Sequence, residues 1–220
     1  MQPKIKICGI TSTGDAVLAE RCGADFTGLV CEIVYSPRCI SRAAAADITR
    51  LSGLPVILLL DKTAPEIVDI ALQVRPFGLQ LIGDLPPDDI ALLKRQTACS
   101  LWLPVRIPGL ANQDFSVAEQ TNRLAALQRA GIDVIILDTM IDGLKGGTGK
   151  TCDWNLAARI VEASPLPVFL AGGITPENAA QAITLVHPAG IDVSSGVEIT
   201  PGVKHAGKIE RLVTEVLSTT

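Results

Sequence analysis

The chain has 220 residues, of which 48% are hydrophobic and only 3% aromatic, and its formal net charge is −4. This charge gives no electrostatic reason to expect nucleic acid or an anionic membrane as a partner, and no apolar run approaches the length of a transmembrane helix. Six cysteines without a CxxC pair and only two histidines do not predict a structural zinc site. The N-terminal apolar run is too short for a signal peptide, so we expect a reduced, cytoplasmic protein.

Short apolar runs and helix-forming stretches alternate along the chain. The expected strands are residues 5–7, 26–30, 56–60, 78–81, 101–105, 134–137, 168–171 and 190–193. The expected helices are residues 13–22, 41–51, 64–74, 87–96, 116–130, 155–163, about 176–186 and roughly 208–217. Eight βα units with no linker between them predict an α/β fold, a single (β/α)8 TIM barrel over residues 1–220. A doubly wound open sheet is the structural alternative.

In such a barrel the chemistry lies at the C-terminal ends of the strands, where two titratable residues follow apolar runs. Cys8 ends the first strand, and it is either a catalytic base or nucleophile or a small buried hydrophobe. Asp138 follows the sixth strand. It is either a general acid, because burial of a carboxyl group is costly without a purpose, or a cap of the following turn.

Other polar residues follow neighbouring strands on the same expected rim. Arg38, in a loop stiffened by Pro37, could clamp a carboxylate or a phosphate through two parallel hydrogen bonds, or it could be a solvated surface charge. Gln80 and Arg106 are possible polar groups of a pocket, although each is weak evidence by itself.

Two breaks near the C-terminus have the composition of a phosphate cradle. Gly172 and Gly173 end the seventh strand, and Ser194, Ser195 and Gly196 end the eighth. Glycine lets an oxyanion approach the main chain, and loops after strands 7 and 8 of barrels commonly hold phosphate. Two ordinary strand-ending turns are the alternative. We predict a small phosphorylated molecule as ligand.

The helix after the first of these breaks has a clear start signal. Thr175 is a good N-cap, Pro176 suits the first helical position, and Glu177 places an acid in the first turn. We therefore expect the helix to begin at Pro176.

The glycine-rich segment at residues 143–151 is similar to a nucleotide-binding P-loop but does not fit one. Its first glycine, Gly143, is one residue out of register with the Gly149–Lys150 pair, and no strand precedes it at the required spacing. A mobile lid after the sixth strand is the better interpretation.

Taken together, these motifs resemble those of the phosphoribosylanthranilate isomerases of tryptophan biosynthesis. The matching pieces are KICGIT (6–11), SPR (36–38), QL-x-GD (80–84), LD (137–138), GGTGKT-x-DW (146–154), LAGGITPEN (170–178) and DVSSGVE (192–198). They occur in order over essentially the whole chain. KICGIT and GGTG…DW are specific, whereas the LAGG and SSG motifs are shared by many phosphate-binding barrels.

The resemblance implies an aldose–ketose isomerase, an intramolecular oxidoreductase that needs no cofactor or metal. Asp138 would be the general acid that opens the ribose ring, and Cys8 the general base that removes the C2′ proton. Arg38 would hold the anthranilate carboxylate, and Gln80 would also contact the substrate. The phosphate would bind to Gly172, Gly173, Ser194, Ser195 and Gly196. Either a monomer or a homodimer is compatible with the sequence.

Three departures from the family pattern keep other functions open. Ile82 stands where the family usually has histidine, residues 28–36 are one residue longer than usual, and the third strand ends in ILLLDK. All three would face the aromatic half of the substrate. The alternatives are an isomerase of another phosphorylated sugar or amine, and a non-catalytic protein that binds a phosphorylated ligand.

Overall fold

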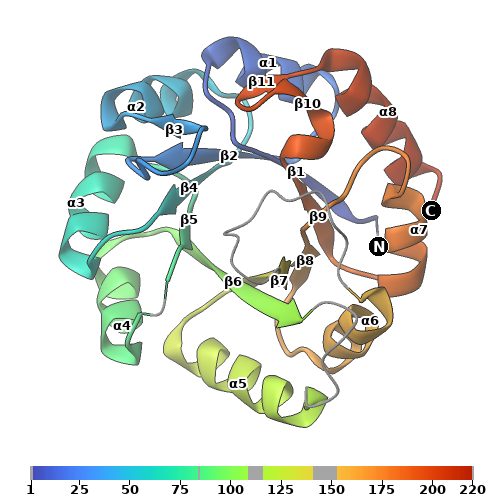
Figure 1. Cartoon of the computed structure of the whole chain (residues 1–220). Coiled ribbons are helices and arrows are strands. Elements are labelled where there is room, and N and C mark those ends of the chain that lie inside the picture. The colour runs from blue at the N-terminus through green and yellow to red at the C-terminus, as the bar shows by residue number, and fades with distance from the viewer. Residues whose placement is uncertain (1, 84, 109–115, 141–152, 220) are drawn as a thin grey trace.

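A computed structural model describes residues 2–83, 85–108, 116–140 and 153–219. Eight parallel strands form a closed ring, seen end-on in Figure 1. The strands of the ring are β1 (Lys4–Cys8), β2 (Phe26–Cys31), β4 (Val56–Leu60), β5 (Gly78–Leu81), β6 (Ser100–Pro108), β7 (Val134–Met140), β8 (Val168–Leu170) and β9 (Gly190–Val193). Pairing of β1 with both β2 and β9 closes the sheet, which confirms the TIM barrel and excludes the open sheet.

The helices lie around the outside of the ring (Figure 1). They are α1 (Thr13–Arg21), α2 (Arg42–Leu51), α3 (Ala64–Val74), α4 (Pro87–Gln96), α5 (Val117–Ala130), α6 (Trp154–Ala163), α7 (Ala179–Val186) and α8 (Ala206–Leu217). Side chains of Ser12, Ser41 and Ser116 cap their helices as N-cap acceptors, and Gly131 ends α5 in the left-handed conformation. Among the described helices, none is long and apolar enough to cross a membrane.

The strands bury two different faces. Outward-facing residues such as Ile5, Ile7 and Leu137 pack against the helices in the larger core. Inside the ring, Trp102 and Phe169 pack with their ring centroids 4.8 Å apart, in a cluster that includes Val134 and Ile136. This alternation along each strand shows which side chains point into the barrel.

Four short elements were not predicted. They are β3 (Cys39–Ile40), the 3-10 helix η1 (Ser195–Val197), β10 (Glu198–Thr200) and β11 (Val203–Lys204). Strand β3 pairs with the end of β2, and β10 with β11 forms an antiparallel hairpin above the end of the barrel. Two or three residues are too few to show a periodic pattern, so their sequences carry no signal of strand structure.

The expected start of α7 at Pro176 is wrong, since the helix begins at Ala179. Asn178 is the reason: its side-chain oxygen accepts a hydrogen bond from Thr175 N–H at 2.8 Å, and its amide donates to the Gly173 carbonyl at 2.9 Å. These bonds hold residues 175–178 as a turn. The asparagine therefore fixes the shape of the loop after β8 before the helix starts.

Candidate active site

Cys8 is the last residue of β1 and lies inside the barrel at its C-terminal end. It is on the same face of the strand as Lys6, whereas Ile7 between them points to the helices. The thiol is buried, in an apolar cluster with Val30, Leu59 and the partly buried Ile82. Burial raises the pKa of the Cys8 thiol, although the positive charge of Lys6 opposes this effect.

Asp138 lies near the C-terminal end of β7, in register with Arg106 of β6. Val134 and Ile136, four and two residues earlier, belong to the cluster inside the ring, so the alternation directs Asp138 inward as well. Its side chain is half-buried. The strand order β1-β9-β8-β7 places Cys8 and Asp138 on different sides of the same barrel mouth.

The two expected phosphate loops lie against each other between these strands. Gly172 and Gly173 follow β8 with φ of 83° and 66°, a left-handed conformation that favours glycine. A Cβ added to Gly196, after β9, would lie 2.1 Å from the carbonyl oxygen of Ile174. Within the described residues, the N–H groups of Gly172, Gly173 and Gly196 have no acceptor. Backbone donors without partners, on two touching loops, suit an anion.

Ser194 adds a hydroxyl group to this region. Its Oγ is buried and finds no hydrogen-bond partner among the described residues. A Cβ added to Gly9 would lie 2.9 Å from this oxygen and 2.4 Å from Cδ of Arg38. Only a glycine at position 9, which has φ of 75°, therefore allows the Arg38 side chain to pass this close to the phosphate loop.

Arg38 is held by a carboxylate that sequence reasoning did not single out. Its Nε and Nη2 donate to the two carboxylate oxygens of Glu198 at 2.8 and 2.6 Å. Lys204 is fully buried and donates to Glu198 Oε1 at 2.8 Å, to the Cys8 carbonyl and to the Ser194 carbonyl. This network of Arg38, Glu198 and Lys204 ties the end of β1 to the loop after β9.

Three comparisons with known proteins identify relatives of this chain. The model of the N-(5'-phosphoribosyl)anthranilate (PRA) isomerase family matches residues 5–215. The N-(5'-phosphoribosyl)anthranilate isomerase of Methanocella arvoryzae is 36% identical, with 97% of each chain covered. The chain belongs to the N-(5'-phosphoribosyl)anthranilate isomerase family. It is thus an isomerase of tryptophan biosynthesis, of the aldose–ketose, intramolecular oxidoreductase type.

Solved structures of isomerases from this family have the same fold. The N-(5'-phosphoribosyl)anthranilate isomerase of Pyrococcus furiosus has a TM-score of 0.83 and 28% identity, with 98% of this chain and 99% of that chain covered. A phosphoribosyl anthranilate isomerase in complex with reduced 1-(O-carboxyphenylamino)-1-deoxyribulose 5-phosphate has a TM-score of 0.79 and 26% identity, with the same coverage of both chains.

The three stretches that are expected from the sequence to depart from the isomerase family pattern lie on one side of the mouth. Ile82 packs against the apolar cluster around Cys8. In the loop after β2, Val34 and Tyr35 are exposed, and the Tyr35 hydroxyl donates to Asp61, just after β4, at 2.6 Å. This hydrogen bond links the loop after β2 to the loop after β4 across the rim.

Four charged residues of this isomerase escaped sequence reasoning: Lys6, Asp192, Glu198 and Lys204. All four are buried. Lys6 and Asp192 could have been found, because each is a charged residue within an apolar strand, in KIKIC and in GIDV. Buried strands rarely contain a charge without a partner, so both positions indicate a polar site. Glu198 and Lys204 lie on the unpredicted hairpin and gave no comparable signal.

Gln80, predicted to contact substrate, lies inside the ring and is buried. Its side-chain oxygen accepts a hydrogen bond from Lys6 at 2.9 Å. The expected lid at residues 143–151 lies outside the described residues, and so does Asp84 of the QL-x-GD motif.

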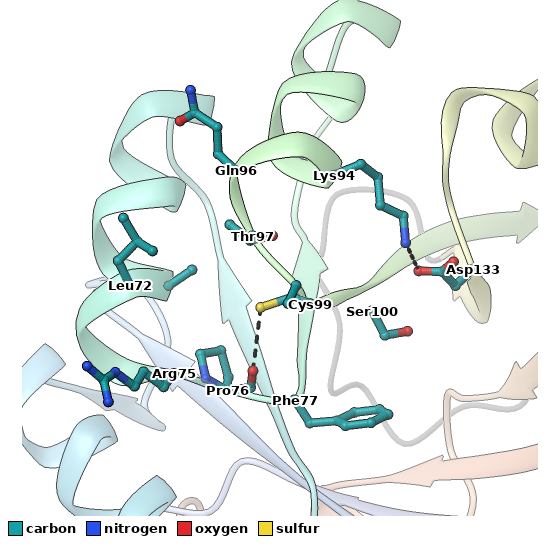
Figure 2. Close-up of a pocket in the computed structure, with 12 residues that line it drawn as sticks. Leu72, Arg75, Pro76, Phe77, Lys94, Gln96, Thr97, Cys99, Ser100 and Asp133 are labelled. Carbon is teal, nitrogen blue, oxygen red and sulfur yellow. Dashed lines mark hydrogen bonds and ion pairs between the residues drawn. The ribbon is translucent and has the colours of Figure 1, made fainter.

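A cavity of about 770 Å³ lies at the opposite end of the barrel from these residues. Figure 2 shows it between the C-terminal ends of α3 and α4, bordered by Phe77, Thr97 and Ser100, which precede or begin β5 and β6. Within it Lys94 pairs with Asp133, and the Cys99 thiol donates to the Pro76 carbonyl. Because strand N-termini support stability in barrels and C-termini carry chemistry, we do not assign the active site to this cavity.

Proposed function

We propose that the chain converts N-(5'-phosphoribosyl)anthranilate into 1-(2-carboxyphenylamino)-1-deoxyribulose 5-phosphate by an Amadori rearrangement. One observation carries the proposal: a buried thiol on β1 and an inward-facing carboxyl group on β7 lie at the mouth that also holds the touching loops after β8 and β9. The names of the relatives and the ligand of one solved neighbour support the same substrate and product.

The rearrangement needs an acid and a base on different sides of the sugar. Asp138 donates a proton to the ribose ring oxygen, and the C1′–O bond breaks to give an open-chain Schiff base. The Cys8 thiolate then removes the C2′ proton to form an enolamine. Return of a proton to C1′ and loss of the C2′ hydroxyl proton give the ketone, so the reaction is a balanced isomerisation.

Substrate binding uses the remaining predicted residues. The phosphate accepts hydrogen bonds from backbone N–H groups of Gly172, Gly173, Ser195 and Gly196, and from the Ser194 hydroxyl. A guanidinium group has five N–H donors, and Glu198 uses two of those on Arg38. The remaining donors bind the anthranilate carboxylate, and the amide group of Gln80 contacts the sugar.

Turnover is followed by the loss of the anthranilate-type fluorescence of the substrate. We expect Cys8→Ala and Asp138→Asn each to lower kcat by about 10²- to 10⁴-fold, the usual contribution of a positioned acid or base. Cys22→Ala is the matched control, because this half-buried thiol is remote from the mouth, against Ala206 at the start of α8. Wild-type turnover no faster than that of the two site variants would contradict the proposal.

A further inference from the structure

Lys6 is a fully buried cation inside the barrel, two residues before Cys8. Its Nζ donates to Asp192 Oδ2 at 2.8 Å and to Gln80 Oε1 at 2.9 Å, from β9 and β5. A buried ion pair costs several kcal/mol of desolvation per ion and often stabilises no better than apolar side chains of the same volume. Packing alone therefore gives no reason to place a lysine here.

The lysine and the thiol border the same small space. Gly28 of β2 is the ladder partner of Cys8, and a Cβ at Gly28 would lie 2.9 Å from Cys8 Sγ and 3.2 Å from Lys6 Cε. With glycine at this position, no side chain of β2 separates the sulfur from the ammonium end of Lys6. An ammonium group has three donors, of which Asp192 and Gln80 accept two.

The charges that face Cys8 come from four elements. Lys6 is on β1, Asp192 on β9, Lys204 on β11, and Arg38 in the loop after β2. Burial raises the pKa of the thiol and so does the Asp192 carboxylate, whereas Lys6 and Lys204 lower it. Among these charges, Lys6 has the largest effect on the pKa of the Cys8 thiol. Burial by itself lowers the pKa of Lys6, but the attraction of the Asp192 carboxylate outweighs this effect and raises the pKa. Lys6 therefore stays protonated.

We propose that Lys6 is a positioning residue whose ammonium group is the counter-ion of the Cys8 thiolate, and that Asp192 and Gln80 hold it in place. The inference rests on the proposed function, in which Cys8 acts as a base. The positive charge of Lys6 would stabilise the thiolate in a buried, apolar cluster, where an isolated anion would be unfavourable. Lys6 donates to Oδ2 of Asp192, whereas Oδ1 is buried and has no hydrogen-bond partner among the described residues. The hydrogen bond from Lys6 therefore satisfies only one of the two carboxylate oxygens.

The test measures alkylation of Cys8 by iodoacetamide between pH 6 and 10, with the modified residue located by mass spectrometry. Lys6→Met alone would leave Asp192 buried and unpaired, so the comparison is Lys6→Met/Asp192→Asn against Asp192→Asn. We expect Cys8 in the double variant to react about tenfold more slowly at pH 8, because loss of the cation raises the pKa of its thiol and leaves less of the reactive thiolate. Its rate should approach that of Asp192→Asn only at higher pH.

Two controls separate a charge effect from a folding effect. Lys4→Met removes a lysine of the same strand that forms an exposed ion pair with Asp25, and it should leave the alkylation profile unchanged. Lys6→Gln keeps a hydrogen-bond donor without the charge, and it should slow alkylation of Cys8 about as much as is expected of the double variant. It also provides the test if the double variant does not fold. Equal pH profiles with and without the Lys6 charge would overturn the inference.

Alkylation needs no substrate, so this result is independent of turnover. If the wild-type chain does not turn over the anthranilate substrate but the loss of Lys6 slows alkylation, the proposed function fails and the role of Lys6 stands. In an active enzyme, we expect Lys6→Gln to lower kcat with little change in KM, and to move the pH–kcat profile to higher pH.

Discussion

The residues around the barrel mouth include more buried charges than simple packing requires, and each has a specific partner. Burial alone would raise the pKa of Glu198, but hydrogen bonds from Arg38 and Lys204 outweigh it and lower the pKa to about 2. The carboxylate is therefore ionised at neutral pH and fixes the direction of the Arg38 guanidinium. A carboxylate that binds one edge of an arginine leaves its other edge oriented for a ligand.

Arg38→Lys tests this orientation. Lysine keeps the positive charge but cannot form two parallel hydrogen bonds with Glu198 and bind a second carboxylate at the same time. We expect kcat/KM to fall by at least about tenfold, chiefly through a higher KM for the anthranilate substrate, a loss of about 1.4 kcal/mol or more.

Arg42→Lys is the matched control for this change. Arg42 pairs with Asp69 and Glu32 on a more exposed surface at the start of α2, so its replacement should leave kcat/KM nearly unchanged. Steady-state kinetics of both variants give the answer. An equal loss for both arginines would mean that Arg38 has no special role in binding.

Sequence reasoning located the residues that follow strands but not their partners. Cys8 and Asp138 could be singled out as candidates because each follows an apolar run at a rim where barrels carry chemistry. Glu198 could not be paired with Arg38 in advance, because 160 residues separate them and β10 and β11 are too short for a pattern. Long-range pairing depends on the closed ring, and a single sequence does not show register.

At the scale of elements, the proposed phosphate site depends on contact between two loops. The turn at residues 175–178, held by Asn178, places the Ile174 carbonyl against Gly196 of η1. The sequence predicted both glycine-containing breaks, since each interrupts an apolar strand. It did not predict the late start of α7, because the Thr-Pro-Glu signal for a helix start competes with the turn chemistry of the asparagine.

Gly196→Ala tests the contact between these loops. The new Cβ would lie 2.1 Å from a backbone carbonyl oxygen, which cannot move away as a flexible side chain can. We expect the loops to separate, the KM for the phosphorylated substrate to rise about tenfold, and stability to fall by about 1–3 kcal/mol, as for other overpacked sites.

Gly14→Ala provides the comparison. At this position in α1 the nearest atom to an added Cβ is Ser12 Oγ at 3.8 Å, an ordinary contact, and alanine favours the helix. Its KM should be that of the wild type, and its stability should be equal or higher. Inhibition by inorganic phosphate gives an independent reading: a Gly196→Ala variant with an unchanged inhibition constant would argue against a phosphate site between the loops.

At the scale of the whole molecule, the barrel separates packing from chemistry along its axis. The aromatic cluster of Phe26, Trp102 and Phe169 is inside the ring, while Lys6, Asp192 and Gln80 form a polar layer beneath Cys8. Alternation along each strand and the closed strand order produce both layers, so the architecture could be predicted from eight βα units. The buried Glu198 carboxylate of the hairpin makes the stability of the whole barrel depend on pH.

Glu198→Gln tests this dependence. The folded-state pKa of about 2 lies below the ordinary value of 4.5, so the carboxylate contributes stability above pH 4.5 that is lost as the pH falls towards 2. The shift corresponds to about 3 kcal/mol. We expect urea unfolding at pH 7 to show Glu198→Gln less stable by about this amount, because Arg38 and Lys204 lose their partner. The difference from wild type should shrink below pH 4.

Glu119→Gln, an exposed change in the first turn of α5, is the matched control and should differ little from wild type throughout. A Glu198→Gln difference that stays constant from pH 7 to pH 3 would show that the carboxylate stabilises the fold by shape and not by charge.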